Sequence, residues 1–146
     1  MLKRFEVHGF KQFQHLTLDF ANVRDYAFNT ECTKNGLVKD AIIYGRNASG
    51  KTNLGLAIFD IIAHLTDMNS GEEFYTYYLK SDSPDEMAAF SYEFLLGNGH
   101  CISYNYQKGS HHLLYGEELK IDEQEVLRWS RKEPIFIDLD FSETYK

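Results

Sequence analysis

Residues 45–52 carry the residue types and the spacing of a loop that binds phosphate groups. They read Gly-Arg-Asn-Ala-Ser-Gly-Lys-Thr, which fits the pattern G-x-x-x-x-G-K-[ST]. The glycines let the backbone curve, so that successive N–H groups can point at a polyphosphate. Lys51 would reach the β- and γ-phosphates of ATP, and the Thr52 hydroxyl would bind Mg²⁺. The predicted ligands are ATP and Mg²⁺, and the predicted binding residues are Gly45, Arg46, Asn47, Ala48, Ser49, Gly50, Lys51, Thr52 and Asn53.

Two flanking segments would position this loop. Residues 41–44 form a short, unbroken apolar run, which is typical of a strand buried on both faces. Residues 51–65 have helical spacing, and their apolar face consists of Leu54, Ile58, Ile61, Ile62 and Leu65. The N-terminus of that helix would add its free N–H groups and its dipole to the phosphate site. The alternative to a strand–loop–helix unit is a glycine-rich turn that happens to carry Lys-Thr.

The rest of the chain reads mainly as strands. Residues 2–10 and 16–20 predict a hairpin, and residues 22–39 predict a loop. Gly97-Asn98-Gly99 predicts a tight turn between strands at 90–96 and 102–106. Further predictions, in chain order, are short strands over 113–121, a short helix over 122–129 started by Asp122, and a final strand over 135–139.

These elements predict an α/β fold: a mixed sheet like that of P-loop NTPases, with a P-loop helix and an antiparallel β-meander. The predicted organisation is one nucleotide-binding lobe over 1–146, divided into 1–66, a loop over 67–88 and a hairpin region with a C-terminal segment over 89–146.

Composition favours a globular chain with a core. The chain has 146 residues, 43% of them apolar, and a formal charge of −7. No apolar run approaches the length of a membrane span, and no secretory signal follows the N-terminus. The two cysteines, Cys32 and Cys101, lie far apart and read as reduced thiols. We therefore expect a cytoplasmic protein that does not associate with membranes.

The loop resembles that of one group of ATPases. Residues 45–54 resemble the G-x-N-x-S-G-K-[ST]-N-L form found in ABC-class ATPase heads of the SMC, RecF and OLD type. Residues 7–13 and 16–20 are similar to the opening strands of those heads, and residues 90–107 with 117–119 look like a segment of AAA-family ATPases from bacterial phage-defence (abortive-infection) systems. The resemblance implies a head that dimerises, as a homodimer or hetero-assembly, with ATP between this loop and a partner's signature motif. It also implies an effector nuclease or a DNA-processing partner.

Other parts of such a head are not found in the sequence. No signature motif is present, and residues 135–138 are the single candidate for a Walker B strand, with Asp138 as its Mg²⁺-side carboxylate and Leu139 where a catalytic Glu should stand. The alternative is an acidic residue that closes an edge strand. Gln107 could contact Mg²⁺, or it could simply end a hairpin strand. The residue that would activate water is not identified.

The predicted function is therefore Mg-ATP binding, with hydrolysis in the complete protein or assembly driving head dimerisation that gates a partner. Two alternatives stay open. The chain could be a regulatory module or an incomplete head that binds ATP without hydrolysing it. It could also be another P-loop enzyme, such as a small-molecule kinase, although few arginines follow the loop.

Overall fold

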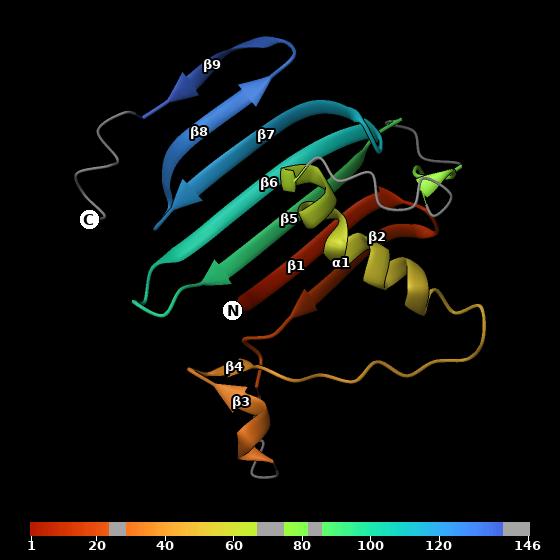
Figure 1. The fold of residues 1–146 in the computed structure, drawn as a ribbon, viewed down its shortest axis with the longest axis vertical. Helices are drawn as coiled ribbons and strands as arrows, with labels where there is room; N and C mark the ends of the chain where they lie inside the picture. Colours follow the sequence, from red (N-terminus) through yellow and green to blue (C-terminus); the bar gives the residue numbers. More distant parts are fainter. Residues whose placement is uncertain (24–28, 67–74, 82–85, 139–146) are drawn as a thin grey trace.

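The fold is a single large sheet with one helix against it (Figure 1). The computed structural model describes residues 1–23, 29–66, 75–81 and 86–138. The elements in chain order are β1 (Leu2–Phe10), β2 (Phe13–Asp19), the 3₁₀ turn η1 (Thr30–Cys32), β3 (Thr33–Lys34), β4 (Leu37–Val38), α1 (Lys51–Thr66), β5 (Ala88–Leu95), β6 (Cys101–Ser110), β7 (Leu113–Ile121), β8 (Gln124–Ser130) and β9 (Glu133–Ile137).

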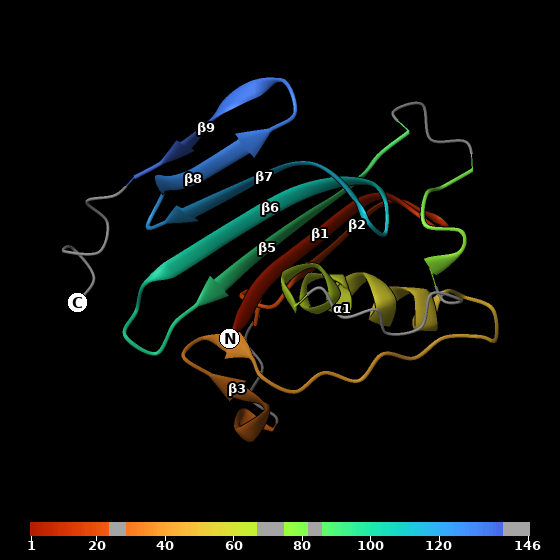
Figure 2. The same ribbon diagram turned by 45° about the horizontal axis from the view of Figure 1, so that its top comes forward.

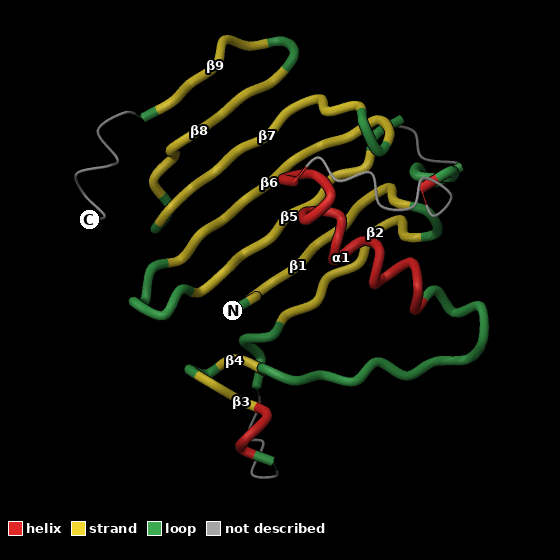
Figure 3. The backbone as a smooth tube through the Cα atoms, in the orientation of Figure 1, coloured by secondary structure: helices red, strands yellow, loops and turns green. Residues whose placement is uncertain are grey.

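The large sheet has seven strands in the order β2-β1-β5-β6-β7-β8-β9 (Figure 3). Every neighbouring pair in it is antiparallel. The chain returns from α1 to the sheet at β5, which pairs with β1 and places Phe5 opposite Tyr92. From β5 onward each strand pairs with the next along the chain, so these strands form a meander. Strands β3 and β4 form a separate two-stranded ribbon.

Tight turns join the strands where the sequence supplies residues that tolerate positive φ. The hairpins predicted at 2–20 and around Gly99 are present, and Gly99 has φ +92°. The short helix predicted over 122–129 is wrong. Asp122 and Glu123 instead make the turn from β7 to β8, with φ values of 48° and 69°. Residues of β8 then alternate, and Leu127 pairs with Leu119 across the ladder.

The helix predicted at the loop is confirmed as α1, which lies across one face of the sheet (Figure 2). Its buried side chains are Leu54, Ala57 and Asp60, which fall three residues apart and so share a face. They pack on a layer of sheet residues that is mostly aromatic: Phe5, Val7, Phe90, Tyr92, Tyr104 and Tyr106. The strands alternate, so the residues between these point to the opposite face, which α1 does not cover.

The predicted fold class is wrong. The sheet is antiparallel over its described length and carries one helix, so the fold is mostly β and not the α/β mixed sheet of a P-loop NTPase. Residues 41–44, predicted as a doubly buried strand, lie outside both sheets and are exposed. The physical reason is that the sheet is built from antiparallel pairs, most of them between strands adjacent in the chain, and β1 already has β2 and β5 on its two sides. Residues 41–44 pair with no described strand, so their apolar side chains stay exposed.

No helix in the described ranges combines the length and the apolar character that crossing a membrane requires.

A side chain in the aromatic layer under α1 should contribute more to the free energy of unfolding than an exposed side chain does. Phe90 is 2% exposed, whereas Phe59 on the outer side of α1 is 62% exposed. We expect Phe90→Ala to lower the free energy of unfolding by about 3–5 kcal/mol, because it leaves a cavity in a packed core. The matched variant Phe59→Ala should change it by about 0.5 kcal/mol or less. Urea unfolding of both variants measures this, and equal losses would contradict the assigned core.

Candidate functional site

The predicted phosphate loop is an exposed curve of backbone that ends at the first turn of α1. Ala48 and Gly50 both have left-handed backbone conformations, with φ of 61° and 93°. Lys51, the first residue of α1, turns its side chain back over the loop. Its Nζ donates hydrogen bonds to the carbonyl oxygens of Gly45 and Arg46, at 2.8 and 2.7 Å. The loop therefore closes around one ammonium group.

Several backbone N–H groups at this turn have no acceptor in the described part of the chain. The first internal bond of the turn runs from the Leu54 N–H to the Gly50 carbonyl, at 2.8 Å. The N–H groups of residues 50–53 precede or begin the helix and are without acceptors among the described residues. Such groups at a helix start favour an anion through hydrogen bonds and the helix dipole. The loop thus presents donors and one cation to the same space.

A hollow of about 350 Å³ lies at this point. It is lined by Gln12, Ala48, Ser49, Gly50, Lys51, Thr52 and Asn53. Thr52 and Lys51, the two side chains predicted to hold Mg²⁺ and the phosphates, thus line one space. Gly45, Arg46 and Asn47 lie on the adjoining exposed stretch and do not line it.

Gln12 is a site residue that the sequence did not reveal. It belongs to the turn between β1 and β2, 41 residues before Asn53, and its Oε1 accepts a hydrogen bond from Asn53 Nδ2. A Cβ added at Gly50 would overlap Gln12 Nε2 and lie 3.4 Å from Phe13 Cζ. The hairpin turn therefore rests directly on the loop. No local pattern marks Gln12 as a site residue, because only the packing of α1 on the sheet brings the two turns together.

The two residues predicted as further Mg²⁺ contacts lie elsewhere. Gln107 lies between Tyr106 and Lys108, whose side chains contact Asp60 of α1, so Gln107 points to the face opposite α1. Asp138 follows β9, at the sheet edge far in strand order from the β1–β2 turn, and its carboxylate accepts a hydrogen bond from Gln124 Nε2 at 2.9 Å. The structure does not bring either residue to the loop.

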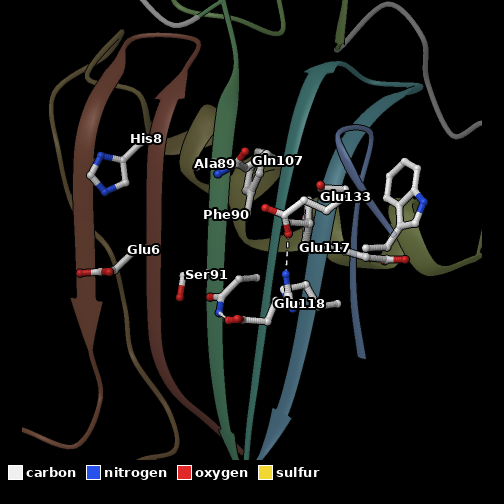
Figure 4. A pocket seen from close by; sticks show the side chains of 15 residues that line it. Glu6, His8, Ala89, Phe90, Ser91, Gln107, Glu117, Glu118 and Glu133 are labelled. Atoms are coloured by element: carbon white, nitrogen blue, oxygen red, sulfur yellow. Dashed lines mark hydrogen bonds and ion pairs between the residues drawn. The ribbon is translucent and has the colours of Figure 1, made fainter. Parts of the chain in front are cut away.

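The face opposite α1 holds a second, shallow hollow of about 470 Å³ (Figure 4). Polar side chains cover it, including Glu6, Ser91, Gln107 and Glu118. Many of these groups bind one another: Asn105 Nδ2 donates to Glu118 Oε2 at 3.1 Å. Burial opposes ionisation of Glu118, but hydrogen bonds from Lys120 and Asn105 outweigh it and lower its pKa. This face is a solvated sheet surface whose groups largely satisfy each other.

A buried polar cluster holds α1 against the sheet. Asp60 is completely buried, and its Oδ2 accepts hydrogen bonds from Tyr106 Oη at 2.8 Å and from Lys108 Nζ at 3.1 Å. Burial lowers the pKa of Lys108, although the charge of Asp60 opposes the shift. Burial also raises the pKa of Tyr106. His64, one turn further along α1, lies 2.8 Å from Tyr104 Oη through its Nε2. This cluster fixes the rotation of the helix and hence the direction of the loop at its start.

A scan against models of protein families matched none of them, and a search of curated proteins found no match. Together with the antiparallel sheet, this overturns the resemblance to ABC-class and AAA-family ATPase heads and with it the link to phage defence. The resemblance depended on short motifs at the loop and the N-terminal hairpin. Both are local features that recur on unrelated folds.

The contact between Gln12 and Gly50 predicts opposite effects for two glycines. Gly50→Ala should lower the free energy of unfolding by about 1–3 kcal/mol, because the residue is left-handed and its Cβ would displace Gln12. Gly55→Ala should raise it by up to about 1 kcal/mol, because Gly55 lies inside α1 with nothing near its Cβ position. Thermal and urea unfolding compare the two, and equal signs would contradict the packing of the hairpin on the loop.

The Asp60 cluster predicts a large loss when one charge is removed. Lys108→Met should lower the free energy of unfolding by about 3–5 kcal/mol, because it leaves the Asp60 carboxylate buried without its cation. Combining it with Asp60→Asn should recover part of that loss. The control is Lys132→Met, at an exposed turn, for which we expect about 0.5 kcal/mol or less. A Lys108→Met protein as stable as the control would refute the role of the cluster.

Proposed function

We propose that this protein binds the phosphates of a magnesium-bound nucleoside triphosphate, ATP in the first test, at the loop over residues 45–52. The observation that carries the proposal is the Lys51 ammonium folded over the loop, 2.8 and 2.7 Å from the Gly45 and Arg46 carbonyl oxygens. Those carbonyl oxygens are neutral, so they attract the ammonium less strongly than a phosphate oxygen would, because the phosphate adds the Coulomb attraction of a full opposite charge. Phosphate oxygens would therefore compete well for the same ammonium.

The groups around the hollow suit binding. Lys51 supplies a cation, the N–H groups of residues 50–53 supply donors, and Thr52 supplies the hydroxyl that would contact Mg²⁺. Gln12 offers an amide from the facing hairpin. These groups act locally, so the proposal does not require the sheet of a P-loop enzyme. A net charge of −7 does not oppose it, because the anion is held by short-range dipoles and one cation.

Hydrolysis and transfer to a second substrate stay predictions for a larger assembly. The described residues lining the hollow include no carboxylate that could activate water, so another chain or segment would have to supply that group. We likewise propose that ATP-dependent association through this site, with an effector or a DNA-processing partner, takes place in such a larger assembly. Binding without turnover is the candidate that the present geometry favours.

The test is stabilisation by ligand. At a free Mg-ATP concentration about 100 times its Kd, binding should add about 2.7 kcal/mol to the free energy of unfolding. Lys51→Ala should abolish this gain and leave the unliganded protein folded, because Lys51 is exposed. Lys132→Ala, at an exposed turn distant in sequence from the loop, is the matched control and should keep the gain. A thermal shift with Mg-ATP that Lys51→Ala leaves unchanged would refute the site.

Two further measurements separate the parts of the proposal. Thr52→Ala should keep the shift produced by ATP in EDTA but lose the additional shift produced by Mg²⁺, since only the metal contact is removed. Phosphate release measured on the same preparation reports turnover. Binding that leaves phosphate release at the rate of the protein-free control would favour the binding module over the ATPase.

A further inference from the structure

Residues 40–46 form an exposed apolar segment that leads from β4 to the loop. In Figure 1 this stretch runs as an open, extended connection below the sheet and α1. Ile42, Ile43 and Tyr44 are 76%, 49% and 85% exposed, which is unusual for three consecutive large apolar residues. The segment carries the composition of a buried strand and has no strand beside it in the described part of the chain.

The backbone of this segment is as unpaired as its side chains. The N–H and carbonyl groups of residues 41–44 have no hydrogen bond to any described residue. An extended segment with free backbone groups and apolar side chains is a template for a further strand. Its natural complement is another extended segment with apolar side chains.

We propose that residues 40–46 pair antiparallel with the same residues of a second copy of this chain, centred on Ile43. In that register Ile43 faces Ile43 of the second copy, and Ile42 faces Tyr44. Asp40 then faces Arg46, so both ends of the pairing carry opposite charges. Pairs of an aromatic with a β-branched residue and of opposite charges are those that stabilise neighbouring strands. A twofold axis through Ile43 repeats each pair, as a closed dimer requires.

The charges select this register over its neighbours. A parallel arrangement would place Asp40 against Asp40 and Arg46 against Arg46. Antiparallel pairing shifted by one residue in one direction would place Lys39 opposite Arg46, and a shift in the other direction would place Ala41 opposite Arg46. Only the register centred on Ile43 neutralises both charges. Arg46 has no ion pair among the described residues, and the Asp40 carboxylate is held only by its exposed neighbour Lys39, at 3.1 Å.

The same register sorts the side chains onto two faces. Alternation places Asp40, Ile42, Tyr44 and Arg46 on one face of the pairing. Two copies together would form an apolar patch of isoleucine and tyrosine bounded at both ends by an ion pair. The other face would hold Ala41, Ile43 and Gly45, which are mostly small. The side chains that pair in this dimer are those of residues 40–46, whereas Lys51 contacts the segment only through the Gly45 and Arg46 carbonyl oxygens. The dimer is therefore expected to form without nucleotide.

The oligomeric state tests the proposal through a charge-reversal cycle. Sedimentation equilibrium of the wild-type protein without nucleotide should show a dimer that dissociates on dilution. Asp40→Arg and Arg46→Asp alone should each raise the dimer Kd by about tenfold or more, because each places like charges opposite one another. The double variant should restore the wild-type Kd to within about threefold, since the pairs re-form with their signs exchanged. Lys34→Asp, an exposed charge reversal on β3, should leave the Kd unchanged.

A second variant checks the centre of the register. Ile43→Lys places two ammonium groups face to face on the axis and should give a monomer, with an unchanged circular dichroism spectrum because the side chain is half exposed. Ile43→Cys, made with Cys32→Ser and Cys101→Ser, should form a disulfide-linked dimer on mild oxidation. Lys34→Cys in the same background should not.

Three results would overturn the proposal. One is a wild-type protein that stays monomeric at every concentration. Another is a dimer that neither Ile43→Lys nor the single charge reversals weaken. The third is a dimer that forms only with Mg-ATP and is lost in Lys51→Ala, which would place the contact at the nucleotide site instead. Failure of nucleotide binding, by contrast, would leave the charge-reversal result intact.

Discussion

The ion pair of Asp60 and Lys108, buried between α1 and the sheet, is the contact on which the arrangement of the site depends. Both charged groups are buried away from water, and an unpaired charge at this position would strongly lower the free energy of unfolding. Each group therefore stabilises the other. The hydrogen bond from Tyr106 fixes the carboxylate further. Since this pair can form at only one rotation of α1, it sets the direction in which the first turn of the helix points. The loop that precedes α1 is positioned by the same constraint.

The aromatic layer and the polar cluster both hold α1 on the sheet, but they contribute in different ways. Burial of Phe5, Phe90 and Tyr92 supplies a large but non-directional stabilisation, which would tolerate some sliding of a helix over a flat surface. The hydroxyl of Tyr92 donates to the carbonyl oxygen of Ala57 at 2.8 Å, and so adds direction to an otherwise apolar contact. Together they bring the first turn of α1 against the β1–β2 hairpin, where Gln12 contacts Asn53.

The described structure buries one face of α1 and leaves several of its other apolar side chains exposed. α1 carries apolar residues on most of its circumference, and Phe59, Ile62 and Leu65 are exposed. The extended residues 41–44 are exposed as well. A helix that is apolar all round is usually buried all round. Along the chain, the loop over residues 45–52 lies between these two apolar segments.

The sequence by itself determined the local features: the extent of α1 and the hairpins at the N-terminus and at Gly99. Each depends on residues close together in the chain, through periodicity, positive φ or a short motif. Which strands pair, and in which direction, depends on contacts between distant residues. The apolar run at 41–44 therefore suggested a buried strand of a mixed sheet, whereas the strands that pair are all antiparallel and leave residues 41–44 outside both sheets. Gln12 at the loop and the Asp60–Lys108 pair were likewise decided by tertiary packing, because 41 and 48 residues of chain separate the groups that meet.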